Sequence, residues 1–140
     1  MIEALAAAAE SQGMPCESWA GVYEQTGGSG FTLGCEGPNP AAHAKFGLAV
    51  TYWTLDGVSD IHLSVWPDAT GTVVSRGAPI PLFSGISGLA AGRPALTWVQ
   101  SHLDDPACAA TCTRTFGTAR LLLTVGANGG RQLEIYGYEH

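Results

Sequence analysis

Alternating apolar and polar residues in the middle of the chain predict a β-hairpin. Residues 48–54 and 58–66 alternate on either side of Asp56-Gly57, a dipeptide that favours a two-residue turn. Because a slip of one residue would mix the two sides of the sheet, this pattern specifies which residues share a face. That turn would pair apolar residues on one face: Tyr52 with Ile61, Val50 with Leu63, and Leu48 with Val65.

Shorter segments on both sides of this hairpin predict further strands. Residues 72–76 read as a third strand that completes a meander, and residues 21–25 and 31–36 read as a pair around a glycine-rich loop. Glycine and proline at 36–40 indicate a break in the chain. We expect residues 41–46 to form one helical turn.

Two segments predict helices. Residues 1–12 are rich in alanine and end at Gly13, which suits the position just after a helix. Residues 93–103 begin near Pro94, which is tolerated in a first helical turn. Glycines and prolines between them, at 77–92, predict an irregular crossing segment. Its apolar anchors would be Ile80, Leu82, Phe83, Ile86 and Leu89.

The C-terminal segment predicts a second hairpin, formed by residues 120–125 and 131–138. Asn128-Gly129 resembles a tight turn, but a turn there would place Leu123 opposite a glutamate. A five-residue loop at 126–130 instead pairs Leu123 with Leu133 and Leu121 with Ile135. The longer loop keeps one apolar face, so we prefer it.

Together these elements predict an α+β fold. We expect an antiparallel sheet of five to seven strands, with the N-terminal helix and the helix near 93–103 packed on one face, in one domain over residues 1–140. The order of elements is broadly similar to that of several small α+β families, including dimeric effector chaperones of bacterial secretion systems. The similarity is one of layout alone, and the cysteines and the extra central strand depart from it.

Charge excludes some classes of partner. Only 13% of the residues are charged, about half the usual ~25%, and the net charge is −6. The single lysine and five arginines are scattered, so a phosphate backbone or an anionic membrane surface is not an expected partner. No apolar run is long enough to span a bilayer, and we expect no direct membrane insertion.

Four cysteines suggest an oxidising compartment. Neighbour pairing would join Cys16 to Cys35 and Cys108 to Cys112, although three pairings are possible. Buried thiols are an alternative, and zinc is another, but Cys108-x3-Cys112 is only half of a zinc knuckle. The sequence begins without a signal-peptide pattern. It therefore belongs either to a cytoplasmic protein or to a periplasmic or secreted domain whose targeting segment was replaced by Met1.

Catalysis has weak support in the sequence. Asp60, His62 and Ser64 share one side of a strand, which permits a nucleophilic triad. No G-x-S-x-G context accompanies them, and they are ordinary residues on a solvated sheet face, which is the interpretation that we prefer. A cleft around Trp98 is a second possible catalytic place. We find no cofactor fingerprint and no complete set of metal ligands, so we expect neither a cofactor nor a metal.

Aromatic residues on the non-core side of the strands are the candidate binding residues. Exposed tryptophan and tyrosine on a sheet are enriched where proteins bind partners, but a helix that covers this face would bury them instead. The sequence thus favours a non-catalytic binding or assembly domain of an exported bacterial protein, with a protein partner or a homo-oligomer; a truncated pilin-like ectodomain is a variant. A small hydrolase and a cytoplasmic acidic chaperone-like dimer are the alternatives. The candidate residues are Trp53, His62, Trp66, Tyr136 and Tyr138.

Overall fold

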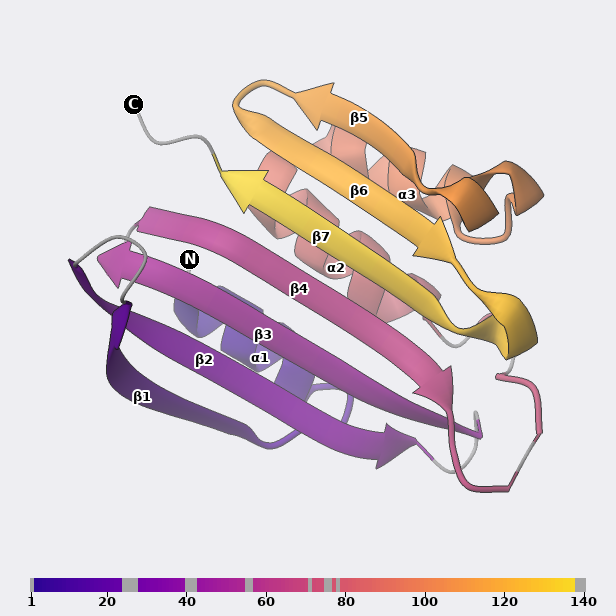
Figure 1. Ribbon diagram of the computed structural model, residues 1–140, viewed down its shortest axis with the longest axis horizontal. Coiled ribbons are helices and arrows are strands. Elements are labelled where there is room, and N and C mark those ends of the chain that lie inside the picture. Colours follow the sequence, from indigo (N-terminus) through magenta and orange to yellow (C-terminus); the bar gives the residue numbers. More distant parts are fainter. Residues whose placement is uncertain are drawn as a thin grey trace.

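A seven-stranded antiparallel sheet with three α-helices on one face makes up the described part of the chain (Figure 1). The computed structural model describes residues 2–23, 28–39, 43–54, 57–70, 72–74, 77 and 79–137, with the backbone alone described at 2, 18–23, 28–31, 52–54, 57–59 and 127. The expected α+β class, the antiparallel sheet and the helices on one face are confirmed. The elements are α1 Ile2–Glu10, β1 Cys16–Tyr23, β2 Gly28–Asn39, β3 Ala44–Thr54, β4 Gly57–Pro67, α2 Ile80–Ala91, α3 Arg93–His102, η2 Pro106–Ala110, β5 Cys112–Phe116, β6 Ala119–Val125, η3 Ala127–Gly129 and β7 Arg131–Gly137.

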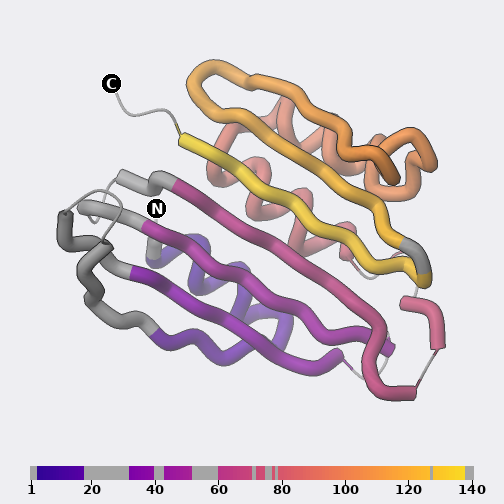
Figure 2. Tube along the Cα trace, in the orientation of Figure 1, coloured from indigo at the N-terminus to yellow at the C-terminus, as the bar shows by residue number. Residues whose placement is uncertain are grey.

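Two halves of the chain meet where β4 pairs with β7. The strand order is β1-β2-β3-β4-β7-β6-β5, so the chain crosses from β4 to the far edge and returns (Figure 2). Ile61 lies opposite Ile135 and Leu63 opposite Leu133 across this seam. Helices α2 and α3 belong to the crossing segment and lie behind the C-terminal strands (Figure 1).

Helix α1 ends as its sequence predicts. Gly13 adopts a φ of +80°, a left-handed conformation that suits glycine. The Met14 N–H donates to the Ala9 carbonyl and the Gly13 N–H to the Glu10 carbonyl, which together form a Schellman motif. The Met14 side chain is buried with Leu5 and Ala9 in the core, so this helix end is fixed by both hydrogen bonds and packing.

The β3–β4 hairpin has the expected faces but not the expected register. The predicted pairs are wrong by two residues, because the ladder contains irregularities between Thr51 and Thr54. A shift by an even number keeps every residue on its own side of the sheet, so the apolar face survives. The turn residues 55–56 lie outside the described residues. The observed pairs are Val50 with Ile61, Leu48 with Leu63, and Phe46 with Val65.

The predicted third strand of the meander is wrong over its described residues. Residues 72–74 have no strand structure, and the edge of β4 is occupied by β7 instead. Val74 is nevertheless buried, and its N–H donates to the Asn128 carbonyl near the β6–β7 loop. Val74 therefore anchors a loop, whereas Val73 beside it is exposed.

Strands β2 and β3 extend through the predicted break and into the predicted helical turn. Residues 36–39 continue β2, and Ala44 already belongs to β3, so both expectations are wrong within the described residues. Pro38 is tolerated because β1 stops pairing at Cys35. The Glu36 N–H points outward to the Pro15 carbonyl, and by alternation the nitrogen of Pro38 faces the same strand-free side.

Helix α2 replaces most of the irregular segment expected at 77–92. Pro79 and Pro81 occupy its start, where a missing N–H costs nothing. Of the expected anchors, Leu82, Phe83 and Ile86 are buried, whereas Leu89 is exposed. A Cβ at Gly88 would approach Leu96 of α3 to 3.0 Å, so this glycine permits close packing of the two helices rather than breaking one.

Two further expectations, the second helix and the C-terminal hairpin, are confirmed. Helix α3 lies where residues 93–103 predict it, and β6 pairs with β7 through the longer loop, with Leu121 opposite Ile135 and Leu123 opposite Leu133. Strand β5, at the outer edge beside β6, was not predicted. The core lies between the helices and one sheet face. Its largest members include Leu5, Met14, Ile61, Leu63, Phe83, Ile86, Leu103, Leu121, Leu123 and Leu133.

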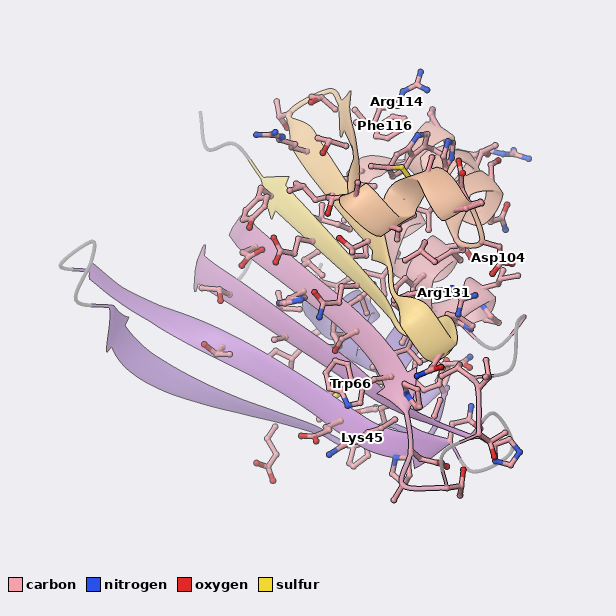
Figure 3. All side chains as sticks on the ribbon, turned by 45° about the vertical axis from the view of Figure 1, so that its right-hand side comes forward. Lys45, Trp66, Asp104, Arg114, Phe116 and Arg131 are labelled. Atoms are coloured by element: carbon pink, nitrogen blue, oxygen red, sulfur yellow. A yellow bond between two sulfur atoms is a disulfide. The ribbon has the colours of Figure 1, made fainter. Side chains whose placement is uncertain are left out.

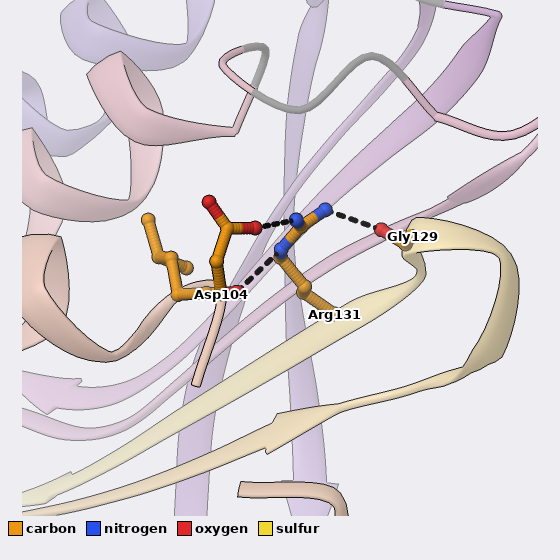
Figure 4. A network of polar contacts seen from close by, with 4 residues as sticks. Asp104, Gly129 and Arg131 are labelled. Atoms are coloured by element: carbon orange, nitrogen blue, oxygen red, sulfur yellow. Dashed lines mark hydrogen bonds and ion pairs between the residues drawn. The ribbon is translucent and has the colours of Figure 1, made fainter. Parts of the chain in front are cut away.

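A buried arginine links the end of α3 to the β6–β7 loop (Figure 4). Arg131 is only 4% exposed. Its Nε donates to the Leu103 carbonyl at 2.7 Å, its Nη1 donates to the Gly129 carbonyl at 2.5 Å, and Nη2 forms an ion pair with Asp104. A buried charge of this kind is tolerated only when its donors are satisfied. Here they bind the Leu103 carbonyl at the end of α3, the Gly129 carbonyl of the β6–β7 loop and the Asp104 carboxylate.

Both disulfides join the cysteines that lie nearest in the sequence. Cys16 and Cys35 are directly opposite each other on β1 and β2. Cys108 of η2 is bonded to Cys112, the first residue of β5. Since β1 and β5 are the two outer strands of the sheet, each disulfide holds one edge.

The two disulfides are expected to contribute unequally to stability. Loop-closure entropy predicts that Cys16→Ala with Cys35→Ala lowers the free energy of unfolding by about 3 kcal/mol, and Cys108→Ala with Cys112→Ala by about 2 kcal/mol. The sequence separations of 19 and 4 residues set this order. Urea unfolding of the parent and both double variants measures the difference, after intact mass with alkylation has verified the thiol state. The reverse order would contradict the entropic account.

Candidate functional site

The sheet face opposite the helices is open within the described part of the chain, and we call it the open face (Figure 1). Alternation places on it the residues whose neighbours along each strand face the core. Trp66 is 43% exposed and Tyr136 is 38% exposed on this face. The described members of its central strands are Lys45, Gly47, Ala49 and Thr51 on β3, Asp60, His62, Ser64 and Trp66 on β4, and Gln132, Glu134 and Tyr136 on β7.

The structure places three of the five predicted binding residues on this face. His62 lies near the middle of the β4–β7 seam, opposite Glu134, and Tyr136 lies at one end of it, opposite Asp60. Trp66 lies towards the end of β4, opposite Lys45 of β3 (Figure 3). The side chain of Trp53 and the whole of Tyr138 lie outside the described residues. The described helices cover the other face, so they do not bury these aromatic side chains.

Acidic and aromatic side chains interact at the centre of the open face. The Tyr136 hydroxyl donates to Glu134 Oε2 at 2.5 Å, and this hydrogen bond, aided by desolvation, raises the pKa of Tyr136 to about 12. His62 Nε2 lies 3.9 Å from Glu134 Oε1. Burial and then the charge of Glu134 raise the pKa of Asp60 above its ordinary value, against smaller opposing effects of His62 and the Ile61 N–H.

Two polar atoms in this cluster lack hydrogen-bond partners. Asp60 Oδ1 and His62 Nε2 are both buried at the atom level and accept or donate no hydrogen bond within the described residues. Leaving such groups unpaired is costly, and in native proteins an ordered water or a bound group usually satisfies them. The centre of the open face therefore has unused capacity to bind a polar or charged group.

The arrangement gives no hydrogen-bonded triad among Asp60, His62 and Ser64. All three side chains are on β4 and share the open face, as the sequence suggests. Their described hydrogen bonds do not join them to one another. In particular, Asp60 Oδ1 and His62 Nε2 have no hydrogen-bond partner in the described part of the chain. Ser64 is only 7% exposed, and its hydroxyl lies against Gly47, where a Cβ would approach it to 2.9 Å.

A shallow depression of about 600 Å³ lies beside this cluster, towards β1 and β2. Small residues form its base, with Gly34 of β2 opposite Ala49 of β3 and with Gly47 next along the strand. Glu17, Glu36, His62, Trp66 and Gln132 stand around it. Sequence reasoning missed the depression. In the sequence, the depression is indicated only by small residues on neighbouring strands. Their positions match only when the register of β2 against β3 is known.

Other kinds of site receive little support from the described residues. They contain no group of three or more His, Cys, Asp or Glu side chains placed to hold a metal ion. The four cysteines are all used in disulfides, so neither the buried-thiol nor the zinc alternative describes them. No described helix combines the length and apolar character needed to cross a membrane.

Neutralising Asp60 is expected to stabilise the protein in a pH-dependent way. Because the pKa of Asp60 is higher in the folded than in the unfolded protein, protonation of Asp60 favours the folded state. This contribution is fully present below the unfolded pKa of about 3.9 and is lost as the pH rises through the folded pKa. Asp60→Asn should therefore raise the melting temperature near neutral pH, with no gain near pH ~3. Thermal unfolding followed by circular dichroism at both pH values measures this.

Asp68→Asn is the matched control. The Asp68 carboxylate accepts hydrogen bonds from the Thr70 hydroxyl at 2.5 Å and the Thr70 N–H at 3.0 Å, and these lower its pKa. Its contribution is present above the unfolded pKa and lost as the pH falls, so Asp68→Asn should not stabilise at neutral pH. A gain for both variants, or a loss for Asp60→Asn at neutral pH, would contradict the description of this cluster.

Comparisons with known proteins give no functional assignment, so a functional argument has to start from the geometry of the structure. The chain shows no significant match to a protein-family model, to a curated protein or to a solved structure. The features that bear on function are therefore the uncovered sheet face, its exposed aromatic residues and its acidic side chains.

Proposed function

We propose that this chain is a non-catalytic binding domain of an extracytoplasmic protein, and that it holds a basic segment of a partner protein on the open face. The observation that carries the proposal is the combination on this face of exposed Trp66 and Tyr136 with an excess of carboxylates. Aromatic residues supply contact area at protein interfaces, and acidic groups attract a basic partner.

Charge on the described open face supports a cationic partner. Glu17, Glu36, Asp60 and Glu134 are acidic, whereas the cations on the same face are Lys45 and Arg120, and Lys45 is already paired with Glu36. The whole chain carries a net charge of −6. An ammonium or guanidinium group brought beside Asp60 and Glu134 would relieve the mutual repulsion that helps to raise the pKa of Asp60.

Exposed aromatic residues add contact area to this charge complementarity. Trp66 (Figure 3) lines the depression, and so do Glu17 and Glu36. A lysine or arginine that enters here can contact the indole face while its charge is balanced by a carboxylate. Tyr136 offers a second aromatic contact at the other end of the polar cluster. An extended basic segment could therefore reach both residues.

The cysteines support the extracytoplasmic part of the proposal. Disulfides persist in the periplasm and outside the cell and are rare in the reducing cytoplasm. Both pairs are local in sequence and secure the outer strands, which supports a structural role. A cytoplasmic acidic dimer, the alternative, would be expected to retain free thiols.

A binding role is preferred to hydrolysis because of the geometry around His62. A general base must lie within hydrogen-bond reach of its nucleophile, and His62 Nε2 has no hydrogen-bond partner among the described residues. The described ion pair of His62 is with Glu134 on β7, at 3.9 Å. The same side chains can serve a binding surface without any change in position.

Replacing Trp66 is expected to weaken binding of a basic peptide. The probe is an extended peptide of alternating lysine and tyrosine, measured by isothermal titration calorimetry. Trp66→Ala should cost about 2 kcal/mol, or roughly thirtyfold in Kd, because buried aromatic anchors dominate interface energies. Rising salt should weaken the parent complex, since the attraction is partly electrostatic.

Leu89→Ala is the matched control. Leu89 is 42% exposed, almost as much as Trp66, but lies on α2 on the helix-covered side of the sheet. It should leave the affinity unchanged, and a peptide with glutamate in place of lysine should not bind. Absence of binding by the basic peptide, equal binding of the two peptides, or equal loss in both variants would each refute the proposal.

A further inference from the structure

A second cleft, of about 550 Å³, lies between helix α3 and the edge strand β5. Its side chains come from one side of α3 and from the helix-facing side of β5, so it is on the opposite side of the sheet from the open face. Figure 3 shows Arg114 and Phe116 on β5, far from Trp66 and Lys45. The residues that matter to its chemistry are Arg93, Thr97, Trp98, His102, Arg114 and Phe116.

Aromatic rings form the base of the cleft. Trp98 is 8% exposed, and the His102 ring is stacked on it with centroids 4.8 Å apart. Phe116 meets the Trp98 ring edge-on at 6.1 Å. His102 Nδ1 lies 2.7 Å from the Trp98 carbonyl and so donates a hydrogen bond to it, which fixes the imidazole ring in place. This base is a preformed apolar surface suited to a flat group.

Two arginines give the cleft a positive charge without an acidic counterpart. Arg93 begins α3 and Arg114 is in the middle of β5, and the residues that line the cleft include no carboxylate. Neither guanidinium has an ion-pair partner in the described part of the chain, where the ion pairs involve Lys45, His62 and Arg131. Arg114 instead lies over the Phe116 ring at 5.6 Å.

This concentration of charge is unusual for the chain. The protein has six lysines and arginines against twelve acidic residues, yet two of the six cations line one small cleft. Exposed arginines near aromatic rings often find a carboxylate of their own chain, which would neutralise them. Here their donors remain available, and guanidinium groups match the planar geometry of a carboxylate.

We propose that this cleft binds a carboxylate attached to a flat apolar ring. The ring would lie against Phe116 and against the His102 ring that is stacked on the buried Trp98, and the carboxylate would accept hydrogen bonds from Arg93 and Arg114. Two sources offer this chemistry: a small aryl-alkyl carboxylate and the C-terminal aromatic residue of a protein. The proposal does not depend on the function of the open face, because the two surfaces share no residue.

The Cys108–Cys112 disulfide positions one wall of the cleft. Cys112, Arg114 and Phe116 alternate onto the same side of β5. Because β5 is an outer strand that pairs with β6 alone, its start is held further by the bond from Cys112 to the fully buried Cys108. The disulfide thereby helps to fix Arg114 and Phe116 opposite α3.

The test uses amide chemical-shift mapping of the intact, oxidised protein. The first probes are N-acetylphenylalanine and its neutral C-terminal amide, with inorganic phosphate as the third. The carboxylate should shift resonances of α3 and β5, whereas the amide and phosphate should bind at least about tenfold more weakly, since each lacks one half of the recognised group. A peptide that ends in phenylalanine, free or amidated at its C-terminus, distinguishes the two sources by its affinity relative to N-acetylphenylalanine.

Arg114→Gln supplies the variant test. Arg114 is exposed, so its replacement should leave the fold intact. The variant should raise the Kd for N-acetylphenylalanine by about tenfold or more. Arg120→Gln removes the same charge from exposed β6 on the open face and should leave the affinity unchanged. Equal effects of the two variants, equal binding of acid and amide, or shifts outside α3 and β5 would overturn the proposal, as would the absence of any shift.

Discussion

The pairing of β4 with β7 is the constraint on which the rest of this structure depends. It joins a four-stranded N-terminal half to a three-stranded C-terminal half through residues about seventy positions apart, such as Leu63 and Leu133. The connection between the halves then has to cross one face of the sheet, and α2 and α3 form within it. One face becomes the core and the other stays uncovered by the described helices, so the open face is a consequence of topology.

Each outer strand of the sheet is held by a disulfide. Unpaired outer strands are exposed to fraying and to wrong pairing. Here β1 is tied to β2 by Cys16–Cys35, and β5 is tied to η2 by Cys108–Cys112. Arg131 adds a third fixed point, at the start of β7, by holding the Leu103 carbonyl, the Gly129 carbonyl and Asp104. Both proposed binding surfaces thus rest on strands whose positions are covalently or electrostatically secured.

Local patterns predict much of the fold, and long-range pairing explains what they miss. Alternation in the two hairpins identifies the apolar faces, because it depends only on the period of a strand. The break expected at residues 36–40 and the irregular segment expected at 77–92 were wrong for a shared reason. Whether a proline such as Pro38 or a glycine such as Gly88 interrupts an element depends on neighbours that are distant in sequence. For the site, His62, Trp66 and Tyr136 were predictable from alternation. The depression over Gly47 was not predictable. A cleft around Trp98 was expected, but its second wall, with Arg114 and Phe116, was not, because both features need a tertiary neighbour.

The central claim is that the open face, and not the helix-covered side, receives a basic partner. Hydroxyl-radical footprinting with and without the saturating lysine–tyrosine peptide tests it most directly, because side chains on both sides of the sheet report in one experiment. The account predicts that oxidation of Trp66 and Tyr136 falls in the complex while that of Leu89 and Phe116 does not change. Protection of Leu89 or Phe116 with Trp66 still reactive would contradict it.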